Sequence, residues 1–219
     1  ISSNIDELCK AKYIITLDSD TKLPRDSARK LIGAMSHILN IAHINKDKKK
    51  VVRGYGIMQP RVAIDTLSSN KTVFSKIFSG EAGIDTYSTA VSDVYQDVFG
   101  EGIFTGKGIY NIDVFNYMLQ DEIPENSVLS HDLLEGSYVR TALVTDVEVI
   151  DGYPAYFNSS SKRLHRWVRG DWQLLPWFKK KRSINGLSKW KMLDNLRRSL
   201  LTPSIILLSA FSYNILPDG

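Results

Sequence analysis

Short β-branched runs alternate in this sequence with segments whose apolar residues recur at helical spacing, and this alternation limits the possible folds more than any other feature. Residues 13–17 (YIITL) and residues 143–150 (LVTDVEVI) are predicted strands, because they are rich in Ile, Val, Thr and Tyr. Pro24 can begin a helix after the first strand. The apolar positions of that helix are Ala28, Leu31, Ile32, Met35 and Leu39. Strands that alternate with helices predict an α/β domain.

The same reading places the other elements. A second strand is expected over residues 51–59, where Pro60 would end it. Residues 72–99 are expected to be mostly helical, with interruptions at Gly80 and Gly83. Three more helices are predicted over residues 113–119, residues 130–140 with Ser130 as the N-cap, and residues 159–178.

Charge is unevenly distributed along the 219 residues, although the net charge is only +4. An uncharged stretch over residues 199–216 is slightly shorter than the roughly 20 residues of a membrane-spanning helix. Basic residues beside an apolar segment are typical of the cytoplasmic face of a membrane. A solvated loop followed by a buried core helix explains the same pattern. We expect one domain over residues 1–198, followed by a membrane-associated or transmembrane helix that starts in residues 199–219. The basic residues before the uncharged stretch are Lys179, Lys180, Lys181, Arg182, Lys189, Lys191, Arg197 and Arg198.

Two carboxylates, Asp18 and Asp20, directly follow the first predicted strand. Ligand sites in open α/β sheets lie at the carboxyl ends of strands, and such a pair can hold a hard divalent ion that neutralises a diphosphate. The pair is equally typical of a turn. Phosphatases of the haloacid dehalogenase type also carry it, with the first Asp as nucleophile, but they place Thr or Val where this chain has Lys22. The single cysteine, Cys9, excludes a cysteine-rich zinc site.

Two later motifs favour one class of enzyme. The letters SHD end at Asp132 at the start of a predicted helix, and the letters RLHRW cover residues 163–167 of another. Their order after the Asp-x-Asp pair resembles the signature of processive inverting glycosyltransferases of the type-A fold, such as cellulose and hyaluronan synthases. Those families usually have Glu at the position of His131 and Gln at the position of Arg163.

Seven sequence blocks, in order, look like the glycosyltransferase segment of bacterial cyclic β-1,2-glucan synthases, a family that carries the Arg-x-x-Arg-Trp variant. The resemblance covers residues 13–199. It implies the C-terminal part of a type-A (GT-A) fold, with a mixed sheet flanked by helices and followed by an amphipathic or transmembrane helix. The blocks are LDSDTKLPR from Leu17, YGIMQPR from Tyr55, FSGEAGID from Phe78, VSDVYQD from Val91, FGEGIFTGKG from Phe99, LSHDLLEG from Leu129 and HRWVRGDWQ from His165.

The resemblance implies a role for each motif. Asp132 would be the base that takes the proton of the acceptor hydroxyl, although an aspartate there also complements a helix dipole. Asp18 and Asp20 would bind Mg²⁺ or Mn²⁺ at the pyrophosphate of the donor. Arg163 and Arg166 are three residues apart on a helix, so they would share a face and bind phosphate oxygens.

The acceptor sugar would lie on an aromatic ring, because such a face covers the C–H surface of a pyranose. Glycine in the loop over residues 100–108 would let backbone approach the sugar. Trp172 and Trp177 are expected to pack in the core or at a membrane interface. The acceptor-binding residues would be Trp167, Phe104, Thr105 and Gly106.

The resemblance also implies partners and a location. The donor would be UDP-glucose and the acceptor a glucan, at the cytoplasmic side of a bacterial inner membrane, in contact with lipid and with no nucleic acid. Only twelve residues precede the first strand, so the uridine-binding unit, further membrane helices and a phosphorylase-like domain are expected elsewhere in the same polypeptide. The isolated chain is therefore expected to bind donor weakly and to be inactive.

Two other classes remain open. One is a non-catalytic, membrane-associated module that binds carbohydrate or a partner, for which Asp132→Asn would change nothing. The other is a metal-dependent phosphatase with Asp18 as its nucleophile, which would not need the Arg-Trp helix.

Overall fold

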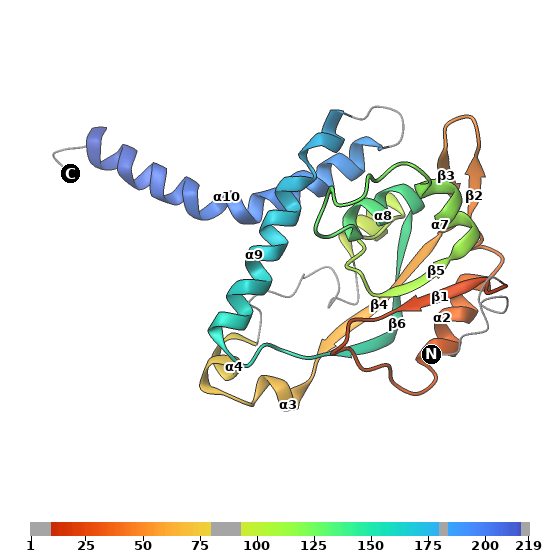
Figure 1. The fold of residues 1–219 in the computed structure, drawn as a ribbon, viewed down its shortest axis with the longest axis horizontal. Coiled ribbons are helices and arrows are strands. Elements are labelled where there is room, and N and C mark those ends of the chain that lie inside the picture. The colour runs from red at the N-terminus through yellow and green to blue at the C-terminus, as the bar shows by residue number, and fades with distance from the viewer. Residues whose placement is uncertain (1–9, 80–92, 180–183, 216–219) are drawn as a thin grey trace.

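A mixed four-stranded sheet forms the centre of the computed structural model, which describes residues 10–79, 93–179 and 184–215 (Figure 1). Its order is β1-β5-β4-β6. The strands β4 and β6 run parallel, and the two other neighbouring pairs are antiparallel. The predicted α/β class and mixed sheet are thus confirmed. The four strands are β1 (Tyr13–Thr16), β4 (Ile57–Ile64), β5 (Gly108–Asn111) and β6 (Thr141–Asp151).

Helices cover both faces of the sheet, because neighbouring residues of a strand point to opposite sides. Ile57 of β4 packs in one core with α7 (Ile112–Leu119) and α8 (Asp132–Val139). The next residue, Met58, packs in a second core with α2 (Ser27–Ser36). The strand therefore connects the two cores through adjacent side chains.

Short elements surround this sheet. The strands β2 and β3 form a separate antiparallel hairpin, and the charged residues 46–49 form its turn. Helices cover both described ends of the segment predicted to be helical over residues 72–99. The bounds are β2 (His43–Asn45), β3 (Lys50–Arg53), α3 (Thr66–Ser69), α4 (Val73–Phe78) and α6 (Val94–Phe99).

The C-terminal part consists of α9 (Phe157–Gln173), the 3₁₀ helix η1 (Leu175–Lys179) and α10 (Gly186–Ile215). Met192, in the first half of α10, is buried in the core beside α8. From Leu200 to Tyr213 the side chains of α10 are exposed, and Figure 1 shows this half running away from the rest of the molecule. The part of the chain that the structure describes holds no helix of the length and apolarity needed to cross a bilayer.

The prediction of one continuous strand over residues 51–59 is wrong, because this segment is divided between β3 and β4. Gly54 lies between them with a φ of 69°, and a Cβ there would lie 1.9 Å from the carbonyl oxygen of Ile41. The chain must therefore turn at this glycine. Pro60 does not end β4 but lies within it, at a register shift between Pro60 and Arg61, where a missing N–H is tolerated.

Three predicted helix boundaries were wrong. The helix expected from Pro24 begins at Ser27. The helix expected to have Ser130 as its N-cap begins at Asp132, and its N-cap is His131. The single helix expected over residues 159–178 ends at Gln173, just before Pro176 in η1. Three other parts of the sequence reading lie outside the described residues, namely Cys9, the interruptions at Gly80 and Gly83, and the basic residues Lys180, Lys181 and Arg182.

Candidate active site

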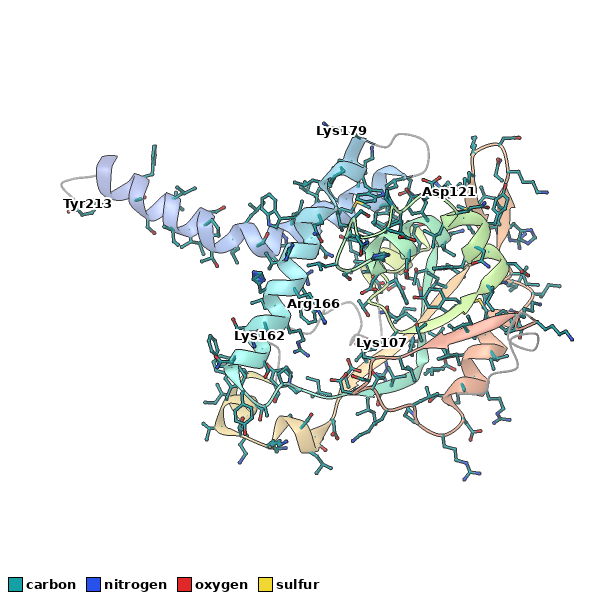
Figure 2. The ribbon with its side chains drawn as sticks, viewed as in Figure 1. Lys107, Asp121, Lys162, Arg166, Lys179 and Tyr213 are labelled. Atoms are coloured by element: carbon teal, nitrogen blue, oxygen red, sulfur yellow. The ribbon has the colours of Figure 1, made fainter. Side chains whose placement is uncertain are left out.

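A cleft of about 620 Å³ separates α9 from the ends of β1 and β6, the loop before β5 and the start of α8. Figure 2 shows Arg166 on α9 and Lys107 before β5 on opposite sides of this region. Four segments that are distant in sequence contribute the predicted site residues, and every one of them lines the cleft. They are Asp18, Asp20, Phe104, Thr105, Gly106, Asp132, Arg163, Arg166 and Trp167.

The aspartate pair follows β1 directly, at the edge of the sheet where the strand ends. The carbonyl oxygen of Asp18 accepts a hydrogen bond of 3.0 Å from the backbone N–H of Thr21. Residues 18–21 therefore form a turn, and this turn carries both carboxylates. The carboxylate of Asp18 lies 2.8 Å from the Lys107 ammonium. Asp20 lies against the end of β6, because a Cβ at Gly152 would be 3.1 Å from its Oδ2 atom.

The carboxylates at this edge could supply part of the coordination sphere of a hard divalent ion. Two carboxylate side chains supply oxygen ligands, which Mg²⁺ and Mn²⁺ prefer. Among residues 10–79, 93–179 and 184–215 no three His, Cys, Asp or Glu side chains gather closely enough to enclose a metal. Two carboxylates fit an ion that would take its other ligands from water and phosphate, as Mg²⁺ does in nucleotide sites.

Asp132 lies in the first turn of α8, opposite the aspartate pair. Burial raises the pKa of its carboxyl; the hydroxyl of Ser130, which donates a hydrogen bond of 3.0 Å to Oδ2, works against this rise. The nearby charge of Asp18 raises the pKa further, and that of Lys107 lowers it. The balance leaves the pKa above its ordinary value, so the ionised form is a better proton acceptor than a solvent-exposed aspartate.

The loop before β5 is held by a buried glutamine. Both the backbone N–H and the hydroxyl of Thr105 donate to Oε1 of Gln59, at 2.6 and 3.0 Å. The ring of Phe104 is only 2% exposed and packs edge-to-face on Tyr110 at 5.4 Å, so this residue borders the cleft from within the core. Gly106 has a φ of 95° and lies directly against Asp132.

The opposite wall of the cleft is α9. The Arg163 guanidinium stacks between two aromatic rings, 5.0 Å from the Trp167 centroid and 5.6 Å from the Tyr153 centroid. Burial lowers the pKa of Arg163, which nevertheless stays charged. Arg166 is exposed, and Trp167 is half-buried. The structure thus places two cations and one partly open aromatic face along the same side.

The two other tryptophans near the site behave differently. Trp177 is 4% exposed and belongs to the core, as the sequence predicted. Trp172 is 44% exposed, so it does not pack in the core, and it donates a hydrogen bond of 3.0 Å from Nε1 to the hydroxyl of Ser199. It therefore joins α9 to α10 at the surface.

The sequence reading missed three residues of the cleft. Lys107 lies in the block FGEGIFTGKG, but nothing in that sequence indicates that its ammonium reaches Asp18 and Asp151, each at 2.8 Å. Asp151 ends β6 just before a glycine, and the rule that selected Asp18 at a strand end could also have selected it. Tyr153 follows two residues later, without a sequence signal of its own.

Comparison with known proteins identifies a relative. No protein-family profile matches the chain. The cyclic beta-(1,2)-glucan synthase NdvB of Rhizobium meliloti (strain 1021) is 52% identical over 192 residues, which are 87% of this chain and 7% of that protein. The chain therefore spans only a small part of the length of this relative. The resemblance drawn from the seven sequence blocks is confirmed, and the chain is homologous to a segment of a cyclic β-1,2-glucan synthase.

Proposed function

We propose that this chain is the catalytic glycosyltransferase part of a glucan synthase, and that it transfers glucose from UDP-glucose to a growing β-1,2-glucan with inversion at the anomeric carbon. The observation that carries this proposal is the gathering of every predicted site residue in one cleft. The similarity to a curated glucan synthase supports the same role. In this proposal residues 1–198 form most of a type-A glycosyltransferase domain.

Asp132 acts as the base. It takes the proton of the acceptor hydroxyl while the hydroxyl oxygen forms a bond to the anomeric carbon and the bond from that carbon to the diphosphate breaks. Attack from the face opposite the leaving group inverts the anomeric configuration. The raised pKa of the Asp132 carboxyl supports this role, because burial makes its ionised form a stronger base.

The leaving nucleoside diphosphate carries negative charge, and the donor side of the cleft supplies the partners for it. Asp18 and Asp20 are the residues that would hold Mg²⁺ or Mn²⁺, which neutralises diphosphate oxygens when bound. Arg163 and Arg166 line the same cleft from α9 and add fixed positive charge. Stacking on Trp167 restrains Arg163, so less conformational entropy is lost when it binds phosphate.

The acceptor lies on the Asp132 side of the cleft. Trp167 offers a half-buried ring as a platform for its terminal sugar. Thr105 and Gly106 border the space between that ring and the base. The fixed position of this loop, held by Gln59, keeps the acceptor hydroxyl within reach of Asp132.

The C-terminal half of α10 suits a membrane surface. Its exposed apolar side chains between Leu200 and Tyr213 directly follow the basic Arg197 and Arg198. Anionic lipid attracts such cations, and the headgroup boundary accepts the apolar side chains. We place the catalytic domain at the cytoplasmic side of a bacterial inner membrane, within a longer polypeptide that supplies the uridine-binding unit, further membrane helices and a phosphorylase-like domain.

The test is glucosyl transfer by the longer synthase that contains this segment, assayed in membranes with labelled UDP-glucose and a divalent cation. We expect label in a glucan with β-1,2 linkages, identified by NMR, and none when Asp18 and Asp20 are both replaced by Asn. A wild-type protein that binds glucan but transfers no label would contradict the proposal and favour a binding module. Hydrolysis of a phosphate monoester such as p-nitrophenyl phosphate, without glucosyl transfer, would indicate a phosphatase.

A further inference from the structure

Lys107 is a buried cation between two carboxylates at the donor end of the cleft. Its Nζ atom lies 2.8 Å from Oδ2 of Asp18 and 2.8 Å from Oδ2 of Asp151. The residue is only 8% exposed. Two carboxylates at hydrogen-bond distance favour the charged form of its amine. The side chain is therefore an ammonium ion at neutral pH.

The two ion pairs of Lys107 are unequal. The carboxylate of Asp151 is 19% exposed and also accepts a hydrogen bond of 2.5 Å from the hydroxyl of Thr21. The carboxylate of Asp18 is 63% exposed. An ion pair that faces solvent is weaker than one that is shielded from it. The contact to Asp18 is thus the one that breaks first.

A divalent ion and Lys107 would compete for the carboxylate of Asp18. A cation bound by Asp18 and Asp20 would lie on the other side of the Asp18 carboxylate from the Lys107 ammonium. Two positive charges separated by one carboxylate repel strongly in a partly buried site. Lys107 would then keep only Asp151. An ammonium has three N–H donors, so the exchange frees a donor on the face of the residue that lines the cleft.

We propose that Lys107 is a built-in cation of the donor site, which neutralises Asp18 until a divalent ion takes that carboxylate and then, anchored by Asp151, donates to the diphosphate of the nucleotide donor. This inference rests on the proposed function and adds to it a residue that contacts the substrate. Lys107 prevents unpaired negative charge between Asp18 and Asp151 in the empty site. It adds positive charge where the leaving group develops its own negative charge.

The decisive variant is Lys107→Met, which keeps the length of the side chain and removes its charge. Binding of Mn²⁺ alone to this chain is measured from the EPR signal of free Mn²⁺, and the contribution of the site is the part lost in Asp18→Asn. Removing the competitor should tighten this binding by about tenfold. In the longer synthase at saturating Mn²⁺, the KM for UDP-glucose should rise by about tenfold, because a phosphate contact is lost.

The opposite directions of the two effects separate this role from a structural one. A variant that only disturbs the fold would weaken both Mn²⁺ binding and donor binding, and that result would overturn the inference. Unchanged or weaker Mn²⁺ binding in Lys107→Met overturns it as well, whatever happens to transfer. An unchanged KM with tighter Mn²⁺ binding overturns the contact with the diphosphate.

Lys22, which follows the turn that carries Asp18 and Asp20, offers a matched control. Its ammonium pairs with Asp65 at 3.0 Å, and its side chain is 61% exposed. Lys22→Met should change neither Mn²⁺ binding nor the KM. Because the Mn²⁺ titration needs no turnover, it reports on Lys107 even if the longer protein transfers no glucose, so failure of the inference and failure of the proposed function remain distinguishable.

Discussion

Gly106 links the loop before β5 to the proposed base, and its replacement by alanine perturbs both. The backbone there has a φ of 95°, which residues with a side chain rarely adopt. A Cβ would lie 2.9 Å from Oδ2 of Asp132, whereas ordinary van der Waals contact begins at 3.4 Å. The Asp132 carboxylate is held by Ser130. Gly106→Ala therefore forces either this carboxylate or the loop to retreat by about half an ångström.

Two costs follow from this geometry. The positive φ should lower the free energy of unfolding by about 1–3 kcal/mol. Misplacing a catalytic group by 1 Å can slow a reaction on the order of a hundredfold, so half that displacement should lower kcat by about tenfold. Donor binding should remain, because the new methyl group faces the Asp132 carboxylate.

A second glycine provides the control. Gly100 has a φ of 69°, and its added Cβ would lie 3.2 Å from the guanidinium of Arg140, at the far end of a long side chain. Gly100→Ala should thus lose comparable stability in urea denaturation while transfer per folded molecule stays near wild type. Equal loss of transfer in both variants, or wild-type kcat in Gly106→Ala, would refute the reasoning.

Four further outcomes are expected. The kcat/KM of transfer should fall on acidification at a pH above 3.8, the ordinary pKa of an aspartate, because burial raises the pKa of Asp132 and the base acts when ionised. The same shift means that the folded state binds this proton more tightly than the unfolded chain, so ionisation of Asp132 destabilises the fold at neutral pH; thermal unfolding at pH 7 should show that Asp132→Asn has an equal or higher Tm. Trp167→Ala should raise the KM for the acceptor by about tenfold in initial-rate assays, whereas Trp172→Ala, which removes a surface contact, should not. Lys191→Met should lower the free energy of unfolding, measured in urea, by about 3 kcal/mol. Lys191 is only 3% exposed, and its ammonium donates to the carbonyl of Gly102 at 2.9 Å and pairs with Glu101. Lys22→Met, which removes an exposed ion pair, should lower the free energy of unfolding by under about 1 kcal/mol.

The elements that local pattern determines could be predicted from the sequence. The strand over residues 13–17 and the helical spacing of Leu31 and Met35 correspond to β1 and to the buried face of α2. The turn at Gly54 could not be predicted, because its cause is the approach of Ile41, which only the tertiary structure reveals. Pro60 misled for a similar reason, since the register shift that accommodates it depends on β6.

The site divides in the same way. Motifs with a fixed order predicted Asp132 and eight other site residues, all of which line the cleft, because each motif is local. Lys107 and Asp151 were missed, because their importance lies in a contact between residues 44 positions apart in sequence, and neither residue type is unusual where it stands. Phe104 was predicted to contact the acceptor, but its ring packs in the core, so its part in acceptor binding remains a prediction.

The most direct measurement compares wild type with Asp132→Asn in the longer synthase, by following transfer of labelled glucose from UDP-glucose beside binding of the donor. Asn keeps the size of the side chain and cannot accept the proton. We expect transfer to fall by about a hundredfold to ten-thousandfold while donor affinity stays within about twofold. Undiminished transfer by Asp132→Asn would contradict the role of Asp132 as the base, and with it the inverting mechanism proposed for this cleft.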